Sequence, residues 1–231
     1  MRKNKSSAFT LIELLVVIAI IAVLASFAVP AITSALTKGQ LVGTVNNARQ
    51  YYLAGYQMAL DGNVNADVNY QWPGDYTAPT ITTLSAYSSK LVTNQYLKVG
   101  DLSKLLSAPG AIVGATGTVD ATTGVTTVVL SGTTPGLKVY RILDADSANA
   151  IFAVSANYTY NTALPATTSP FGDTGFVVMR KGGDAISLRK NNATVANYTD
   201  CTTFQSAVGK LTGDVDGTLG TESSALVLAF P

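Results

Sequence analysis

The chain has 231 residues, a formal net charge of +1 and only 13% charged residues, a length that suits one or two domains. It contains no histidine and a single cysteine, Cys201, which excludes Ser-His-Asp catalysis, histidine-bearing zinc sites and an intramolecular disulfide. The near-neutral charge argues against nucleic-acid binding, because that function needs a basic surface.

The N-terminal region combines a short basic leader with a long apolar run. Arg2, Lys3 and Lys5 come first, and no residue from Leu14 to Thr37 is charged. A helix of this length and composition is able to cross a bilayer. Glu13 stands at the start of the run, and a carboxylate in such a segment is costly, so we treat it as a functional-site hypothesis.

Three interpretations of this N-terminus remain open at this point. A secretory signal peptide has a shorter apolar core that ends at a cleavage site, whereas here Ser26 to Ile32 lead directly into more helix-compatible sequence. An uncleaved membrane anchor accounts for the apolar run but leaves Glu13 unexplained. The third interpretation is a cut before the apolar run, which would leave the helix on the mature protein.

The junction Ser7-Ala8-Phe9-Thr10-Leu11-Ile12-Glu13-Leu14 resembles that of the type IV pilin and type II secretion pseudopilin superfamily. Members have a basic leader, a small residue before the cut, an aromatic mature N-terminus and an acid at the fifth mature position. Here these last three are Ala8, Phe9 and Glu13, although the family usually has glycine where Ala8 stands. Pro30 matches a proline at the twenty-second mature position of many members. The resemblance covers about the first thirty residues.

The resemblance implies how the chain is processed. A prepilin peptidase would cut between Ala8 and Phe9 and methylate the new amine of Phe9. The basic leader would hold that end in the cytoplasm, as the positive-inside rule requires. The single-pass subunit would then wait in the inner membrane, with its globular domain extracytoplasmic, for extraction by an assembly platform. Its destination would be an extracellular or periplasmic filament of copies of itself or related pilins.

In such a filament the apolar helices would form a central bundle. We expect Glu13 to pair with the Phe9 amine of a neighbouring copy, because a buried charge is heavily penalised only when it is unpaired. The alternative is that Glu13 reaches back to the membrane interface, one turn away. Pro30 predicts a kink, since proline removes a helix hydrogen bond and clashes with the preceding turn.

The sequence predicts an α+β fold, with a long N-terminal helix packed on an antiparallel β-sheet domain. We divide the chain into a leader (1–8), a transmembrane or filament-core helix (9–32), an amphipathic continuation (33–62) and an extracytoplasmic α/β loop and β-rich domain (63–231). One apolar stripe predicts the buried face of the continuation: Leu41, Val45, Ala48, Tyr52, Tyr56 and Ala59. Asp61-Gly62 predicts its C-terminus.

The remaining chain predicts short helices followed by strands. Leucines between residues 84 and 106 favour one or two helices, and Thr116 to Leu130 favours a hairpin. Further strands are expected in 137–143, 151–160 and 224–230. The strongest hairpin signal is Gly182-Gly183, between segments 176–180 and 185–189.

One segment near the C-terminus is a candidate metal site. Asp214 and Asp216 resemble part of an EF-hand calcium loop, but Thr212 and Ser223 occupy the positions where acids are expected, and Glu222 is one residue early. Major pseudopilins bind calcium in a C-terminal loop, so the family resemblance supports this hypothesis. The alternative is a plain Asp-Gly turn without a metal. No other cofactor is expected.

We therefore interpret the chain as a structural, non-enzymatic subunit of a type IV pilus-like or type II secretion pseudopilus filament. The alternative is a membrane-anchored extracytoplasmic enzyme or binding protein with an uncleaved anchor. Asp144 and Asp146 are its carboxylate candidates, and they have no evident partner base. A surface adhesin or DNA-uptake pilin is a third possibility, against which the near-neutral charge argues.

Overall fold

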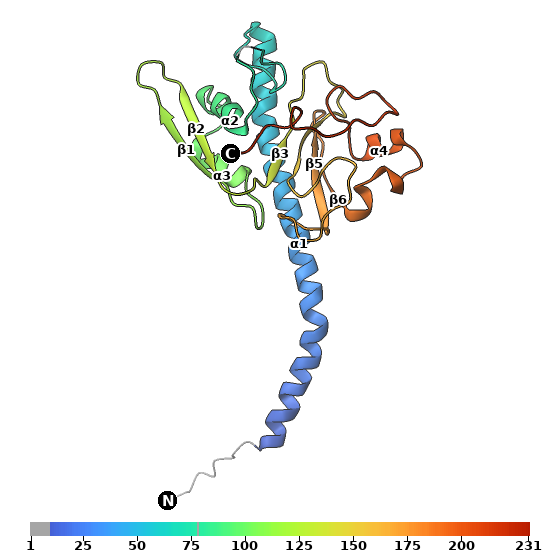
Figure 1. Ribbon diagram of the computed structural model, residues 1–231. Helices are drawn as coiled ribbons and strands as arrows, with labels where there is room; N and C mark the ends of the chain where they lie inside the picture. The colour runs from blue at the N-terminus through green and yellow to red at the C-terminus, as the bar shows by residue number, and fades with distance from the viewer. Residues whose placement is uncertain (1–9, 78) are drawn as a thin grey trace, which may run out of the picture. The chain divides into compact units, whose positions relative to one another are not determined.

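The computed structural model describes residues 10–77 and 79–231. It divides into two compact units, Met1–Gly39 and Gln40–Pro231. Helix α1 (Leu11–Asn65) contributes to both (Figure 1), and it is the helix that the apolar run predicts. All other helices and strands of the described residues belong to the second unit.

A four-stranded antiparallel sheet forms one half of the second unit, in the order β3-β4-β5-β6. The strands are β3 (Leu137–Val139), β4 (Ile151–Ser155), β5 (Gly175–Arg180) and β6 (Ala185–Arg189). Every residue of β4 and all but the last residue of β5 are buried, so these two strands form the centre of the sheet. The predicted hairpin around Gly182-Gly183 is confirmed as β5–β6.

A separate antiparallel hairpin, β1 (Gly114–Val119) and β2 (Thr126–Ser131), packs with α2 (Leu84–Thr93) and α3 (Val99–Leu105). Three side-chain hydroxyls of α2 bind backbone N–H groups of β2. Ser85, Ser89 and Thr93 accept hydrogen bonds from the backbone N–H groups of Leu130, Val128 and Thr126, at 3.3, 2.8 and 2.9 Å. Their i, i+4 spacing places them on one face of the helix, so α2 covers the outer edge of β2.

The chain after β6 forms two 3₁₀ turns, η1 (Lys190–Asn192) and η2 (Val195–Asn197), and helix α4 (Cys201–Ala207). The final segment was expected to be a strand at 224–230. In the structure it makes isolated bridges to Thr83 and Tyr140 rather than a full strand. It still pairs along β3, because the N–H of Leu228 donates to the carbonyl of Val139 at 2.8 Å.

The core of the second unit is built around the buried face of α1. Tyr51 and Tyr52 contact Phe152 of β4, with ring centroids 6.2 and 5.5 Å apart. Trp72, the single tryptophan, stacks on Tyr52 at 5.9 Å. This packing confirms the predicted α+β arrangement of a long helix on antiparallel strands.

The buried face of α1 differs from the prediction in two residues. Leu41, Ala48, Tyr52 and Ala59 are buried as expected, but Val45 is half-buried at the edge of the core and Tyr56 is 43% exposed. Tyr56 lies at the border of the stripe, where it stacks on Tyr52 with 5.8 Å between ring centroids.

The predicted end of the helix is also wrong. Gly62 is a buried residue inside α1, which continues to Asn65. A Cβ on Gly62 would lie 1.7 Å from the carbonyl oxygen of Tyr70, so glycine here permits close approach of the following loop. The left-handed residue beyond the helix is Ala66, with φ of 53°.

Candidate functional site

The first turn of α1 is closed by a reciprocal pair of side chains, Thr10 and Glu13. The N–H of Glu13 donates to the Thr10 hydroxyl at 3.3 Å, and the N–H of Thr10 donates to Glu13 Oε2 at 2.8 Å. The Thr10 hydroxyl also donates to Glu13 Oε2 at 2.7 Å. This is a capping box, which satisfies backbone N–H groups that a helix start leaves free. Glu13 therefore has a structural partner within its own chain.

Two of the predicted site residues, Ala8 and Phe9, lie outside the described residues. Glu13 is exposed in the structure, and only its Oε2 atom takes part in the capping box. An ionised carboxylate has acceptor positions on both oxygens. The capping box therefore leaves Oε1 available for a further partner.

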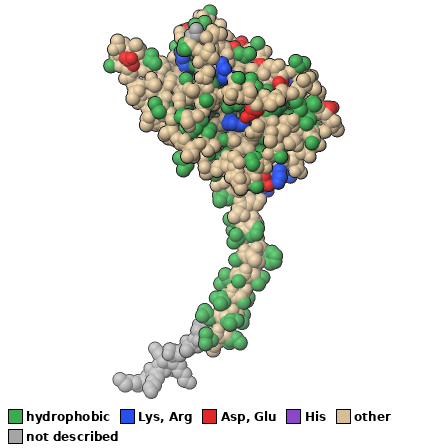
Figure 2. Space-filling view, viewed as in Figure 1, with side chains coloured by type: hydrophobic (Ala, Val, Ile, Leu, Met, Phe, Trp, Pro, Cys, Tyr) green, Lys and Arg blue, Asp and Glu red, His purple; other side chains and the backbone are tan. Residues whose placement is uncertain are grey.

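The part of α1 in the first unit has an apolar surface on all sides. Figure 2 shows hydrophobic side chains along it, and an 18-residue window has a mean hydropathy of 2.9 with none of its residues buried. Among the described helices it is the one long and apolar enough to cross a membrane. Among the described residues of this unit none covers these side chains, so lipid or other protein chains have to supply the cover.

Pro30 lies within α1, and the helix continues on both sides of it. Proline has no N–H to donate, so the preceding turn loses one backbone hydrogen bond. The Thr33 hydroxyl donates to the carbonyls of Val29 and Pro30 at 3.1 and 3.0 Å, and this adds local bonds on the C-terminal side. The kink itself stays a prediction.

A second apolar stripe on α1, not recognised from the sequence, lies in the second unit. Its side chains are between 43% and 76% exposed: Val42, Leu53, Tyr56, Leu60 and Val64. Their spacing by three, four or eleven residues places them on one helix face. We call this set the outer stripe. It was missed because the buried stripe accounts for the amphipathic pattern alone.

In the structure, the two candidate calcium ligands, Asp214 and Asp216, each bind a different group of the protein. Asp214 Oδ2 accepts from the N–H of Gly220 at 3.1 Å, and Asp216 Oδ1 pairs with Lys210 Nζ at 2.7 Å. Among the described residues there is no group of three or more acidic, cysteine or histidine side chains that would hold a metal. Calcium binding stays a prediction, and this geometry favours an Asp-Gly turn held by protein contacts.

Glu222, considered with the calcium loop, instead anchors the C-terminal segment. Its carboxylate pairs with Lys138 Nζ at 2.6 Å and accepts from the Tyr140 hydroxyl at 2.5 Å and the Tyr160 N–H at 3.0 Å. Burial raises the pKa of the Tyr140 phenol well above its usual value, and the Glu222 charge raises it further. Tyr140 thus remains a neutral hydrogen-bond donor at physiological pH.

The carboxylates of the enzyme alternative are also engaged in local structure. Asp146 accepts from the N–H groups of Leu143 and Gly213 at 2.7 and 3.2 Å. Asp144 accepts from the Asn63 amide at 3.3 Å. Lys181 donates to the backbone carbonyls of both residues. These bonds tie the turn at 143–146 to the β5–β6 hairpin and give the two carboxylates a structural role.

Comparison with known proteins bears on the N-terminal motif directly. Residues 3–29 match the family model described as the prokaryotic N-terminal methylation motif. The chain is also 30% identical over 105 residues to the type IV major fimbrial protein FimA of Dichelobacter nodosus, covering 43% of this chain and 67% of that protein. No solved structure matches significantly. The methylation motif, the long apolar helix and this similarity together show that the chain belongs to the type IV pilin family.

Proposed function

We propose that this protein is a structural subunit of a type IV pilus-like or type II secretion pseudopilus filament, built from the inner membrane. The observation that carries the proposal is the surface of α1, whose apolar residues are exposed throughout the first unit. The outer stripe adds apolar surface in the second unit. A bundle of α1 helices from neighbouring copies would cover both surfaces, as burial of apolar area favours.

The precursor is expected to span the inner membrane once, with its basic N-terminus in the cytoplasm. Prepilin peptidase would cleave between Ala8 and Phe9 and methylate the Phe9 amine. Mass spectrometry of the intact protein tests this step. The expected mature chain begins at N-methylated Phe9 and has lost the first eight residues. A protein that retains Met1, or begins after Pro30, would contradict the proposal.

Glu13 has two roles in this proposal. Within its own chain it closes the capping box with Thr10, as described above. In the filament its free oxygen would accept the charged Phe9 amine of a neighbouring copy, and this pair would fix the axial register. The two roles are compatible because they use different acceptor positions of one carboxylate.

Two substitutions of Glu13 separate these roles. Glu13→Gln keeps the capping acceptor, since glutamine serves in a capping box, but it removes the charge. Glu13→Ala removes both. If the charge sets the register, both variants lose most filaments, on the order of tenfold, when they are expressed with the assembly platform and counted by electron microscopy. Normal filament yield from Glu13→Gln would show that the charge pair is not needed.

The similarity to a major fimbrial protein favours a filament made mainly of this chain. Sheared filaments analysed by quantitative mass spectrometry would test this expectation. The chain should account for most of the filament protein. If it is a trace component, it serves instead as a minor subunit.

Calcium is the remaining proposal for the loop that contains Asp214 and Asp216. Its test is the melting temperature of the purified protein with calcium and with a chelator. A calcium-dependent rise would establish the site, whereas equal melting temperatures would assign the loop to the protein contacts of Lys210 and Gly220.

A further inference from the structure

The two sheets of the second unit have four outer edges, and the chain itself covers two of them. The hydroxyls of α2 cover β2, and the C-terminal segment covers β3. In the described part of the chain, the outer edges of β1 and β6 receive no comparable cover from another segment. An uncovered edge carries unpaired N–H and C=O groups that another strand is able to bind.

The hydrogen bonds of the covered edge identify the free groups of β1. The N–H groups of Thr126, Val128 and Leu130 point away from β1, toward α2. Their partners across the hairpin are Val119, Gly117 and Ala115. In an antiparallel pair, opposed residues point their backbone groups both inward or both outward. The backbone groups of these three β1 residues therefore point to the open edge.

The same reasoning identifies the free groups of β6. The N–H of Arg180 donates to the carbonyl of Asp184 at 3.0 Å, which makes these two residues an inward-bonded pair. Inward and outward residues alternate, so Ala185 and Ser187 point their backbone groups away from β5.

The β1 edge also lacks the usual protection against pairing. Strands at natural sheet edges are commonly guarded by charged residues or proline. From Pro109 to Gly136 the only charged residue is Asp120, and β1 itself contains neither a charge nor a proline. Val119 is 67% exposed at the end of this edge. An unguarded edge of this kind favours a partner strand.

Contacts with α1 show in which direction the strands at the open edges run relative to this helix. Gly175, at the start of β5, lies next to Leu41, and the Tyr52 hydroxyl donates to the carbonyl of Lys181, just after β5. Strand β5 therefore runs in the direction of α1, and β6 runs against it.

The hairpin has the opposite arrangement. Ser88 of α2 bonds to Tyr51 at 3.1 Å, and Asn94 reaches Met58 Sδ at 3.6 Å, so α2 runs in the direction of α1. The hydroxyls of α2 contact β2 in reverse order, so β2 runs against α1 and β1 runs with it.

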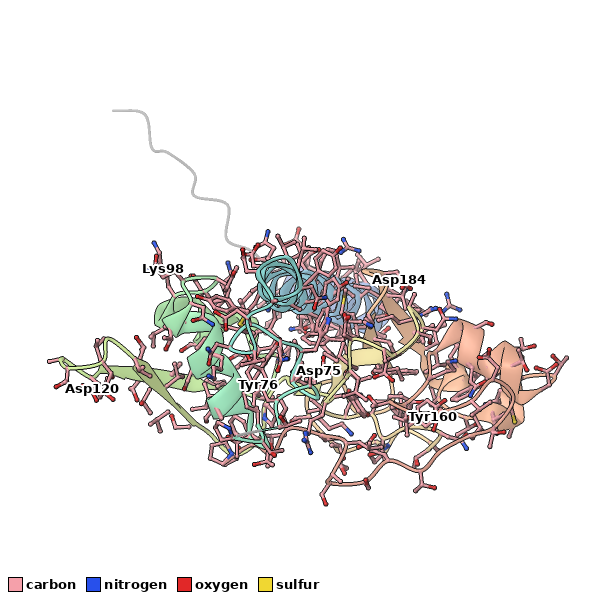
Figure 3. All side chains as sticks on the ribbon, turned by 90° about the horizontal axis from the view of Figure 1, so that it is seen from above. Asp75, Tyr76, Lys98, Asp120, Tyr160 and Asp184 are labelled. Atoms are coloured by element: carbon pink, nitrogen blue, oxygen red, sulfur yellow. The ribbon has the colours of Figure 1, made fainter. Side chains whose placement is uncertain are left out.

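Figures 1 and 3 show the hairpin, with Asp120 at its tip, and the β6 side, with Asp184, on opposite sides of α1. Two copies with parallel α1 helices would therefore meet with β1 and β6 antiparallel. Gly117, in the middle of β1, lies opposite Val128, whose N–H bonds to Ser89, and the adjacent Ser88 contacts Tyr51; the middle of β1 therefore lies near Tyr52 along α1. In β5, Gly175 lies next to Leu41 and Lys181 next to Tyr52, so Ser187, the β6 partner of Val177, lies about five residues earlier along α1. At 1.5 Å per residue, the paired copies would be offset by about 8 Å along the helix.

We propose that β1 of one copy pairs antiparallel with β6 of the next copy, so that neighbouring second units share a continuous sheet. The contact joins two different edges, so it repeats without closing and generates a filament when combined with a helical offset. The inference rests on the proposed filament function, because that function makes the α1 helices parallel.

Cross-linking in assembled filaments tests the pairing. Val119 and Ser187 are exposed residues of β1 and β6, and both point their backbone groups to the open edge, so their side chains would share one face of the joined sheet. Filaments of Val119→Cys/Ser187→Cys, in a Cys201→Ser background, are treated with a short bismaleimide. The expected result is a ladder of dimers, trimers and higher multimers, with no ladder from either single-cysteine variant. Filaments without a ladder would overturn the pairing while leaving the filament function intact. A ladder from a single variant would also overturn it.

Proline substitutions provide a second test that needs no cross-linker. Val119→Pro and Ser187→Pro remove outward N–H groups while sparing the bonds within each hairpin. Their controls, Val119→Thr and Ser187→Ala, retain those groups. The proline variants should reduce filament yield at least fivefold relative to the controls, with melting temperatures of the solubilised subunits within a few degrees of each other. Equal yields would refute the pairing. If the unmodified chain makes no filaments with its assembly platform, the filament function itself fails.

Discussion

The two parts of α1 are continuous in sequence and in helix, but different surroundings stabilise them. From Leu11 to Gly39 all residues are exposed except Thr37, which is half-buried. From Gln40 onward, ten residues of the same helix are buried in the second unit. The hydrophobicity of a helix therefore does not tell whether its own chain covers it. The first part needs lipid or other protein chains to cover its apolar surface, and the second part depends on its own core.

Alkaline pH is expected to have the largest effect, because several buried tyrosines contribute to it. It should act on the second part of α1 and its domain alone. The first tyrosine of the chain is Tyr51, so the first part has none. Burial raises the pKa of Tyr52 and Tyr76 to about 12, and of Tyr87 and Tyr140 well above the usual value. Above pH ~10 the unfolded chain loses these protons while the folded chain retains them, so stability falls as pH rises.

Each fully buried tyrosine contributes a slope of about 1.4 kcal/mol per pH unit in this range. In the solubilised protein, the fluorescence of buried Trp72 should therefore change to that of an unfolded domain between about pH 10 and pH 12. The helical circular dichroism of the micelle-embedded first part should persist. Simultaneous loss of both signals would show that the two parts unfold as one unit.

A core truncation makes the same contrast with a single side chain. Tyr51 is fully buried against Phe152 and Tyr87, whereas Val16 in the first part is 48% exposed. Tyr51→Ala should lower the free energy of unfolding by about 3–5 kcal/mol, the usual cost of deleting a buried aromatic side chain. Val16→Ala should change it by less than about 0.5 kcal/mol.

Urea denaturation of the solubilised chain measures both variants. Trp72 is the single tryptophan and only 3% exposed, so its fluorescence reports the core of the second unit. Comparable losses from both substitutions would mean that the first part contributes to that core.

Replacing either of two glycines of α1 by alanine is expected to change the stability in opposite directions. A Cβ at Gly62 would meet the Tyr70 backbone at 1.7 Å, so Gly62→Ala should destabilise the second unit by about 1–3 kcal/mol through overpacking. Gly43 has no atom within 4 Å of its Cβ position, so Gly43→Ala should stabilise the helix by about 0.5–1 kcal/mol. Both are read from urea midpoints. Equal effects of the same sign would show that intrinsic helix propensity decides both sites.

Local sequence signals predicted much of the fold. Glycine pairs mark the β5–β6 turn, and alternating apolar residues mark its strands, so this hairpin was found. The contacts of Ser85, Ser89 and Thr93 with β2 were not predictable, because they join residues more than 30 positions apart. Helix α4 was missed as well, since Cys201–Ala207 is short and has little apolar periodicity.

The motif at the candidate site was predicted from the sequence, but the roles of Ala8, Phe9 and Glu13 stay predictions. Residues 3–29 match the methylation motif, as the sequence resemblance implied. The spacing Thr10-x-x-Glu13 is itself a capping-box signal. The cost of a carboxylate in an apolar segment instead favoured a partner outside the chain. The hydrogen bonds show a partner for Glu13 inside its own chain, and the partner in a neighbouring copy stays a prediction.

The smallest expected effect lies at this capping box. Thr10→Ala removes the hydroxyl that accepts from the Glu13 N–H, and the loss of such a cap costs about 1 kcal/mol of local helix stability. Amide hydrogen exchange of residues 11–14 in micelles should accelerate about fivefold, whereas Thr10→Ser should retain most of the protection. The urea midpoint reported by Trp72 should not move in either variant, because the cap lies in the first unit and Trp72 in the second. A shifted midpoint would mean that the helix start stabilises the distant core, and the division of α1 into two independently stabilised parts would then be wrong.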